Sequence, residues 1–366
     1  MYKKKFIYWP VLSLVIFGFM FYTKGMKSTH IDGPYISWEG GDKVQFTYVG
    51  YDTIQVFEQA IDPAMEKSTF NGFLSDEGRE YYISKSYKPE ASPVYTAPKA
   101  LYLGNIYGDY DGLVEFLKTH GIVNEKGNWA WDKGHLVFTG NVFGYGADVV
   151  RCLWFIAQLE QEAASAGGKV HMLLGDQEIK NMSGNIGTLN PTLYRLYKQM
   201  DIEYSGFYAP TTIQGKWLRS KNSIIKINNN LVAHGGISPE IVSYKLDLKT
   251  INTAIREQLT AQAPEQDSIA QLVMSSKGPL KYSSYIKDGE ENLQLMENHV
   301  DSVLNYYDAS SMIIATTGAK AVYSTFGNKI YAIDLPMDKT DVTLEGLLQE
   351  EDSFYRITSA GEKIKI

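Results

Sequence analysis

The sequence predicts an α/β protein, and three observations support that class. Apolar runs that read as buried strands alternate with helical patterns, in the order 101–107, 112–120, 135–139, 147–166 and 169–174. A polar, glycine-containing segment follows each apolar run. Strands that alternate with helices usually form parallel sheets with right-handed crossovers. From the residues alone we therefore expect residues 100–366 to form one domain, with a parallel sheet that carries helices on both faces.

The second half of this region shows the same elements in a less regular order. Further helical patterns lie at residues 191–200, 246–273 and 292–305. Further strand patterns lie at 224–227, 231–233, 311–315 and 329–333, and a turn of three asparagines separates the first two.

Residues 31–98 differ in pattern and predict a β-rich N-terminal extension. Residues 43–49 and 81–86 alternate between apolar and polar side chains, as half-buried strands do. Two X-Pro pairs then mark residues 88–99 as a linker. We expect the extension to be a small unit that packs on an edge or face of the main sheet.

The first 25 residues predict a targeting segment. Three lysines at positions 3–5 precede an uncharged run from 6 to 23, and Lys24 closes it. As a helix the 18-residue run would span about 27 Å, close to the hydrocarbon thickness of a bilayer. An uncleaved signal anchor and a cleaved signal peptide both fit. Either one exports the rest of the chain, so we expect an extracytoplasmic protein, periplasmic or at the cell surface, that is membrane-anchored or secreted.

Composition and charge exclude several classes of function. The 366 residues carry a net charge of −7, and without the four lysines of the targeting segment the remainder carries −11. An acidic body argues against nucleic acid as a partner, because phosphate backbones attract basic surfaces. The single cysteine, Cys152, excludes an intrachain disulfide and a cysteine-based metal cluster.

Polar residues flanked by glycine follow the predicted strands and mark the candidate site. In open α/β sheets ligands bind at the carboxyl ends of the strands, and glycine lets the backbone turn sharply there. The sequences at these ends are GNIYGD (104–109), GNVFGYG (140–146), GDQE (175–178), HGG (234–236) and TTG (316–318). We expect them to converge on one crevice that brings Asn105, Asn141, Asp176 and His234 together.

These strand-end sequences resemble the motifs of the calcineurin-like metallophosphoesterases, in particular the Shewanella-like phosphatase branch. That family reads GDIHGD, GDVFDRG, GNHE, HGG and a late GH, in the same order along the chain. The resemblance extends over residues 100–335 and includes the phrases DVVRCLWFIAQLEQEAASAGGKVHMLLG, WLRSKNSIIKIN and LVAHGGISPEI. It implies a sandwich of β-sheets flanked by helices and a metal-dependent phosphoesterase ancestry.

The resemblance also implies six metal-ligand positions, which this chain fills with Asn105, Tyr107, Asn141, Asp176, His234 and Thr317. Two metal ions about 4 Å apart activate a hydroxide in such sites and need anionic and imidazole ligands. Only Asp176 and His234 retain the family's residue types. Gln177 stands at the position of the family's acid histidine, and Tyr145 at that of its phosphate-binding arginine.

We therefore expect a pseudophosphatase that acts by binding an unidentified protein or small-molecule ligand, with no catalytic residue, metal or other cofactor. The first alternative is an active phosphomonoester hydrolase with one divalent metal on Asp176 and His234, completed by Asp109 or Asp111. The second alternative is unrelated chemistry in the same pocket. Arg219 is a candidate anion contact in any of these cases.

Overall fold

The computed structural model describes residues 31–38, 41–50, 53–62, 64, 66–71, 80–260, 267–285, 293–336 and 344–366. The predicted targeting segment, residues 1–25, lies outside these ranges. Within them, no helix combines the length and the apolar character that crossing a bilayer requires.

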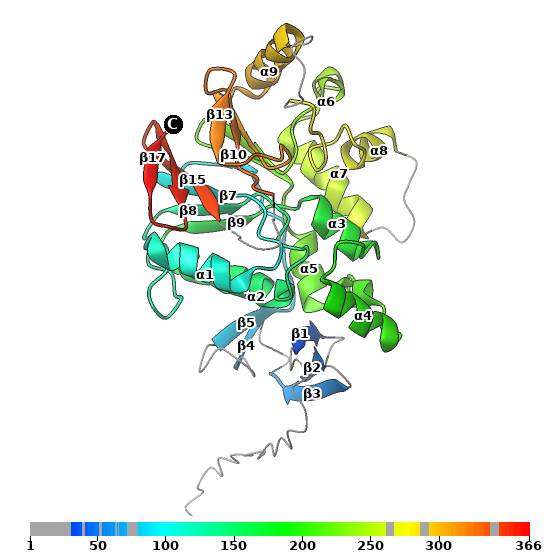
Figure 1. The fold of residues 1–366 in the computed structure, drawn as a ribbon. Helices are drawn as coiled ribbons and strands as arrows, with labels where there is room; N and C mark the ends of the chain where they lie inside the picture. Colours follow the sequence, from blue (N-terminus) through cyan, green and yellow to red (C-terminus); the bar gives the residue numbers. More distant parts are fainter. Residues whose placement is uncertain are drawn as a thin grey trace, which may run out of the picture.

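Two six-stranded sheets form the centre of the molecule (Figure 1). The first has the order β17-β16-β15-β7-β8-β9. Its strands are β7 (Lys99–Leu103), β8 (His135–Phe138), β9 (Lys169–Met172), β15 (Glu345–Glu350), β16 (Ser353–Thr358) and β17 (Lys363–Lys365). The second has the order β13-β14-β12-β11-β10-β6. Its strands are β6 (Val94–Tyr95), β10 (Ile224–Ile227), β11 (Asn230–Ala233), β12 (Ser311–Ile314), β13 (Tyr323–Thr325) and β14 (Ile330–Ala332).

Alternating apolar side chains bury both faces of the first sheet. Ala100, Tyr102 and Val137 belong to a hydrophobic cluster shared with the second sheet. Leu101 and Leu103 belong to the cluster that includes the helices. Successive residues of a strand point to opposite faces of the sheet. Because these strands carry apolar side chains at every position, both faces of the sheet must be covered. The second sheet covers one side and α1 (Tyr110–Thr119) and α2 (Val149–Ser165) the other (Figure 1).

This layering confirms the β-sandwich flanked by helices and corrects the expectation drawn from the residues alone. Helices cover only one face of the first sheet, because the second sheet takes the other. The sheet is also mixed: β7, β8 and β9 are parallel, but β15 pairs antiparallel with β7. On the outer side of the second sheet lie α7 (Leu248–Thr260) and α9 (Leu293–Tyr307) (Figure 1).

Along the chain, the remaining described helices come between the strands of the two central sheets. They are α3 (Asp176–Met182), α4 (Pro191–Gln199), the 3-10 helix η1 (Tyr204–Tyr208), α5 (Ile213–Arg219), α6 (Pro239–Ser243) and α8 (Ser268–Met274). The single helix expected over 246–273 is two helices, α7 and α8, separated by residues outside the description. The proline that starts α4 suits its first turn, and Asn190 caps that turn by accepting from Thr192 N at 2.9 Å.

The described part of the extension is β-rich, as expected. A three-stranded sheet comprises β1 (Asp32–Ser37), β2 (Lys43–Val49) and β3 (Ile54–Ala60), and a hairpin comprises β4 (Lys67–Asn71) and β5 (Glu80–Ser84). The contacts of this unit differ from the expectation, since among the described elements β1 packs mainly on the helices α2 and α5. Gln214 of α5 accepts from Ile36 N at 3.0 Å and donates to the Pro34 carbonyl at 2.7 Å. Strand β6 lies inside the predicted 31–98 extension but pairs with β10 in the second sheet.

A buried carboxylate ties β1 to α4. The Asp32 carboxylate accepts from the hydroxyls of Tyr35 at 2.7 Å and Tyr197 at 2.5 Å. Burial raises the pKa of both phenols well above the usual value, and Asp32 raises it further, so both hydroxyls remain donors. Hydrogen bonds to a charged group in the interior are stronger than neutral ones. They join two segments that are 165 residues apart in the chain.

Replacing Tyr197 with phenylalanine tests this connection. The variant removes one donor from a buried carboxylate, so we expect the free energy of unfolding to fall by about 1.5–3 kcal/mol. Urea denaturation followed by tryptophan fluorescence measures it. Tyr194→Phe, on the exposed side of the same helix, is the matched control and should change stability by less than about 0.5 kcal/mol. Equal effects of the two substitutions would contradict the proposed connection.

Candidate functional site

Backbone hydrogen bonds bring the ends of β7, β8 and β9 together. Ile106 N and Tyr107 N both donate to the Asn141 carbonyl, at 3.0 and 2.9 Å. Gly140 has a φ of 101°, and a Cβ there would lie 2.5 Å from Gly175 N. Only glycine allows this approach between the second and third strand ends. The loops after the three parallel strands therefore form one continuous wall.

Residues at the strand ends of the second sheet lie against these loops. His234, which follows β11, is buried, and its Nδ1 lies 3.0 Å from the Thr139 carbonyl in the first sheet. Ala315 N, which follows β12, donates to the His234 carbonyl at 2.8 Å. A Cβ on Gly104 would lie 2.4 Å from the Ile333 carbonyl, which follows β14. These contacts place the ends of β11, β12 and β14 next to the ends of β7 and β8.

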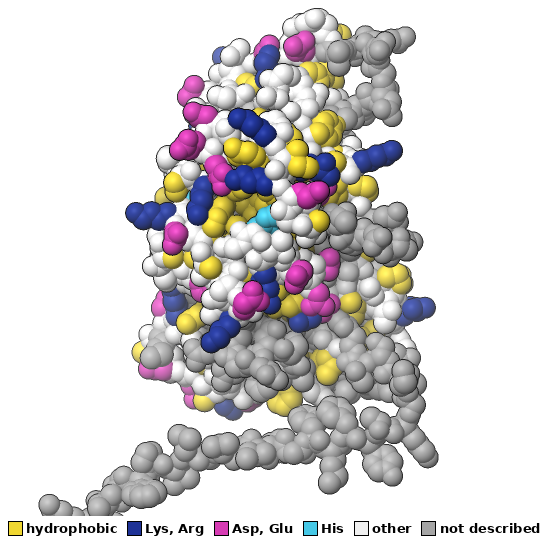
Figure 2. Space-filling view, turned by 60° about the vertical axis from the view of Figure 1, so that its left-hand side comes forward, with side chains coloured by type: hydrophobic (Ala, Val, Ile, Leu, Met, Phe, Trp, Pro, Cys, Tyr) yellow, Lys and Arg dark blue, Asp and Glu magenta, His cyan; other side chains and the backbone are white. Residues whose placement is uncertain are grey.

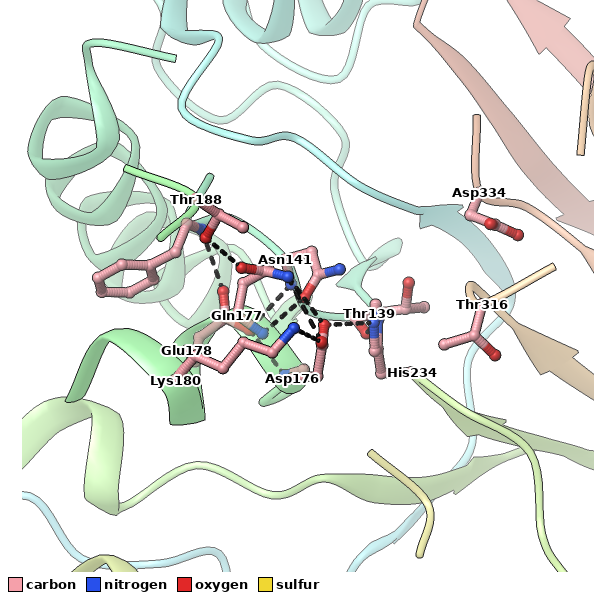
Figure 3. Close-up of polar contacts among 12 residues, drawn as sticks. Thr139, Asn141, Asp176, Gln177, Glu178, Lys180, Thr188, His234, Thr316 and Asp334 are labelled. Carbon is pink, nitrogen blue, oxygen red and sulfur yellow. Dashed lines mark hydrogen bonds and ion pairs between the residues drawn. The ribbon is translucent and has the colours of Figure 1, made fainter. Parts of the chain in front are cut away.

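Asp176 begins α3 and is surrounded by donors (Figure 3). Lys180 Nζ lies 2.5 Å from Oδ2, and His234 Nε2 lies 3.5 Å from Oδ1. Burial alone would raise the pKa of Asp176, but the hydrogen bonds and charges of His234 and Lys180 outweigh it and hold that pKa well below its usual range. The carboxylate is therefore ionised at neutral pH and neutralised by the protein's own side chains.

Glu178 holds the loop after β8 against the start of α3. Its fully buried carboxylate accepts from Asn141 N, Val142 N, Phe143 N and Gly175 N at 2.7–3.1 Å. Burial raises the pKa of Glu178 and the backbone donors partly offset that rise. Glu178 lies two residues after Asp176 in the GDQE sequence. In the structure its oxygens bind backbone N–H groups.

Asp334 is a site residue that the sequence analysis missed. It directly follows the β14 strand pattern and is buried. Its carboxylate accepts from Thr317 N at 2.8 Å and Gly318 N at 2.6 Å, and also from the Thr317 hydroxyl. Figure 3 shows Asp334 on the far side of His234 from Asp176. The sequence feature that could have indicated Asp334 is its place directly after the last predicted strand, residues 329–333.

Neutral side chains fill the first two strand-end loops. Tyr107 and Asn141 have φ of 53° and 55°, in the left-handed region that a bulky tyrosine disfavours. Burial raises the pKa of Tyr107 to about 12, so its phenol stays protonated at neutral pH. Asn141 Oδ1 accepts from Gln177 N at 3.1 Å. Asn105 Oδ1 is buried without a hydrogen-bond partner among the described residues.

The residues at the six implied ligand positions do not fit a pair of divalent cations. Four of them are amides, a phenol and a hydroxyl, which supply no negative charge. Asp176 already pairs with Lys180, and the Thr317 hydroxyl donates to Asp334. Over the described ranges, no three or more His, Cys, Asp or Glu side chains are grouped so that they could hold a metal ion.

Three further candidates serve the fold. Asp109 caps α1 by accepting from Gly112 N at 3.1 Å, and Asp111 is exposed with a 4.0 Å contact to Arg151. Arg219 was a candidate anion contact, but its guanidinium donates to the carbonyls of Leu259, Tyr208 and Gly215. These bonds connect α5 to α7 and η1, which corrects the expectation for this residue.

Comparison with known proteins identifies the fold and a resemblance to a known family. No protein-family model matches the chain. It is 29% identical to a cold-active protein tyrosine phosphatase of a psychrophilic Shewanella, with a TM-score of 0.80, covering 92% of this chain and 99% of that chain. A 1.1 Å structure titled as a cold-active protein tyrosine phosphatase gives a TM-score of 0.81 at the same identity. The chain therefore has the fold of these phosphatases and resembles the Shewanella-like phosphatase branch of the calcineurin-like phosphoesterases in sequence.

Two named relatives carry the same family name. Shewanella-like protein phosphatase 1 of Plasmodium berghei is 24% identical over 260 residues, which are 70% of this chain and 71% of that protein. Shewanella-like protein phosphatase 2 of Arabidopsis thaliana is 30% identical over 83 residues, or 23% of this chain and 21% of that one. The family's fold is therefore kept over most of this chain.

Replacing Glu178 with glutamine tests its role in holding the loops. The amide keeps one acceptor oxygen and turns an NH2 group toward backbone donors, so we expect a loss of about 2–4 kcal/mol in the free energy of unfolding. Chemical denaturation measures the loss. Glu125→Gln, at an exposed turn, is the control and should be neutral. An unchanged midpoint for the Glu178 variant would show that the four bonds do not stabilise the fold.

The lowered pKa of Asp176 predicts a pH dependence. A carboxyl whose folded pKa is below its unfolded value stabilises the fold above the unfolded pKa, and that stability disappears as pH falls through the folded pKa. The stability difference between the wild type and Asp176→Asn should therefore be constant above about pH 5 and shrink below about pH 4. Denaturation at four pH values measures this. A difference that grows on acidification would refute the assignment.

Proposed function

We propose that this protein is a catalytically silent phosphoesterase-fold protein that acts by binding. The observation that carries the proposal is the contrast between strand-end loops that backbone hydrogen bonds hold together and neutral side chains at the positions implied to ligate metal. The family's backbone frame is kept through the Glu178 and Asn141 bonds. The charges that a dinuclear centre requires are missing from Asn105, Tyr107, Asn141 and Thr317.

A glutamine also stands at the position that the resemblance implies for the acid that protonates a leaving alkoxide. Gln177 stands where the resemblance implies a histidine, and its carboxamide does not release a proton at neutral pH. The side-chain oxygen of Gln177 accepts from the Thr188 hydroxyl, and its nitrogen lies 3.4 Å from the Asp176 carboxylate. Gln177 thus contributes hydrogen bonds within the wall of the crevice.

The local charges do not favour a phosphate dianion. Asp176, Glu178 and Asp334 place carboxyl groups around the crevice, and Lys180 is paired with the first of these. Tyr145, half exposed, occupies the position implied for an arginine, and its ring centroid lies 6.1 Å from that of Tyr107. Aromatic rings at the opening suit an uncharged or apolar group of a ligand better than a phosphoryl group.

The proposal includes export of the protein and a protein or small-molecule ligand. The basic, apolar segment at residues 1–25 supports export, with the body of the chain outside the cytoplasm and either tethered or released. Figure 2 shows basic and acidic side chains interspersed over the face in view, which supports a protein or small-molecule ligand over nucleic acid.

An active phosphomonoesterase is the second candidate, and one distance favours it. Asp176 Oδ1 and His234 Nε2 lie 3.5 Å apart, a separation that permits both atoms to bind one cation. The phosphatases among the relatives agree with this candidate.

Metal analysis and a turnover assay distinguish the two functions. We expect the purified protein to contain far less than one equivalent of metal and to leave p-nitrophenyl phosphate intact with or without added Mn²⁺. Each missing catalytic group typically costs about 10²–10⁴ in rate, so the combined losses leave no measurable turnover. Stoichiometric metal with turnover that His234→Ala abolishes would establish the second function.

Restoring the family's residues tests whether the frame is intact. The variant carries Asn105→Asp, Tyr107→His, Asn141→Asp, Gln177→His and Thr317→His. We expect it to bind Mn²⁺ in titration calorimetry where the wild type does not, because the backbone already places these positions around one crevice. A folded variant that binds no Mn²⁺ would show that the loops are no longer arranged for metal.

A further inference from the structure

Two buried histidines on neighbouring strands form a hydrogen bond with each other. His135 begins β8 and His171 lies on β9, and both side chains are buried. His171 Nε2 lies 3.1 Å from His135 Nδ1. Such a bond needs a hydrogen on one of the two nitrogens and a lone pair on the other. When both rings are protonated, every ring nitrogen carries a hydrogen. The bond is then lost, and two positive charges face each other in the interior.

A short segment of chain covers this histidine pair. The segment, residues 88–97, precedes β7 and is called the strap below; it contains β6, an edge strand of the second sheet. His171 lies on β9, an edge strand of the first sheet. The ring of Tyr95 in the strap packs edge-on against the His171 ring, with the ring centroids 4.5 Å apart. The strap therefore lies directly on the pair, where the edges of the two sheets meet.

Few hydrogen bonds attach the strap to the second sheet. Lys226 N donates to the Pro93 carbonyl at 2.8 Å, and Asn228 N donates to the Tyr95 carbonyl at 2.9 Å. The Asn228 side chain exchanges two further bonds with the backbone of Ala97, at 3.0 and 3.1 Å. Strand β6 itself is only two residues long. A segment with so few contacts can open without unfolding of the rest of the domain.

The groups that surround the pair and Tyr95 disfavour positive charge on the rings. The charged groups are Lys169 on β9, Lys221 after α5, Arg256 on α7, Glu160 on α2, and Lys88 and Glu90 in the strap. Each of the two carboxylates already pairs with a lysine, Glu90 with Lys169 at 2.8 Å and Glu160 with Lys221 at 2.5 Å. The facing residues of β7 and β10, Ala100 and Ile225, do not titrate.

Burial and these cations keep both rings neutral at neutral pH. Burial lowers the pKa of His135 to about 4, and the charge of Lys169 contributes to the lowering. Burial also lowers the pKa of His171 well below its usual value, and His135, Lys169 and Lys221 lower it further. A cavity of about 60 Å³ beside His171 exceeds the roughly 10–15 Å³ that one water molecule needs. Protons from the solvent can therefore reach the pair.

We propose that the His135–His171 pair is an acid-sensitive latch that holds the strap on the two sheets at neutral pH and releases it when both rings are protonated. Release exposes the rings to water and returns their pKa to the usual value, so the released state takes up protons. The docked strap is fully stable above about pH 6.5 and loses stability as the pH falls toward the docked pKa values. The latch does not rest on the proposed function.

Amide hydrogen exchange of the full chain, followed by mass spectrometry and corrected for the intrinsic rate at each pH, measures the docking of the strap. The reporters are peptides that cover residues 93–97 and 224–228. We expect their protection to fall about 10- to 100-fold between pH 6 and pH 5, because each proton taken up changes the opening equilibrium about tenfold per pH unit. Protection of β15 and β16 should stay unchanged. Unchanged protection of the strap, or an equal loss in β15 and β16, overturns the inference.

Two variants assign the effect to the histidines. The double variant His135→Asn, His171→Gln places an amide near each bonded ring nitrogen and removes both titrating groups, so its strap should be equally protected at pH 6 and pH 5. Glu90→Gln is the matched control: it removes the ion pair between the strap and Lys169 and keeps both histidines, so the loss of protection should remain. A double variant that keeps the acid sensitivity, or a Glu90 variant that lacks it, overturns the inference.

The titration of the wild-type histidines decides the case if the double variant does not fold. Exchange of the imidazole C2 hydrogen, measured from about pH 4 to pH 8, reports the protonation of each histidine separately. We expect His135 and His171 to become protonated over the same pH range in which the strap loses protection. Rings that stay neutral throughout that range would show that another group releases the strap and would overturn the inference.

Discussion

The carboxylate of Glu178 fixes the geometry on which the crevice depends. Four backbone N–H groups, from the loop after β8 and from the start of α3, converge on its two oxygens. Buried N–H groups without partners would each cost free energy, and these loops have no strand or helix partner for them. One side chain thus holds Asn141 and Asp176 at the same opening. The rest of the site is built on that position.

Backbone hydrogen bonds fix the conformation of the strand-end loops, although the side chains in these loops differ from the family's metal ligands. Tyr107 and Asn141 both adopt left-handed conformations, and for a tyrosine that conformation is costly. Surrounding bonds impose it: Tyr107 N donates to the Asn141 carbonyl, and Gly146 N donates to the Tyr107 carbonyl. The loops therefore take their shape from the frame and keep it with residues that bring no ligand chemistry.

Most of the fold could be predicted from the sequence because its central strands are short apolar runs with clear ends. The strands at 135–138, 224–227 and 311–314 lie within one residue of their predicted bounds. The second sheet behind the first could not be predicted from periodicity, since a strand buried by helices and one buried by another sheet have the same apolar pattern. The resemblance to a known family supplied that layer. The antiparallel strands after residue 344 were missed because residues such as Gly346 and Gln349 interrupt their apolar pattern.

The site was predictable in position and less so in its contacts. Strand-end glycines located the crevice, but hydrogen-bond partners depend on side-chain geometry that no spacing encodes. Arg219 was assigned to the crevice from its neighbours in the sequence, yet the carbonyls of α7 and η1 take its donors. Asp334 carries no motif, and only the approach of β12 and β14 at their ends brings it to Thr317. For both Arg219 and Asp334, contacts between distant parts of the chain determine the hydrogen-bond partners.

The neutral residues at the implied ligand positions and the partners of the remaining carboxyl groups together keep the site free of unpaired negative charge. Two amides and a hydroxyl at positions 105, 141 and 317 remove charged ligands, and each remaining carboxyl group has donors within the protein. Lys180 serves Asp176, while backbone N–H groups serve Glu178 and Asp334. Carboxylates at these positions would repel one another in a buried site unless cations lay between them. In the structure neutral residues stand there instead, and Lys180 lies beside Asp176, so this repulsion does not arise.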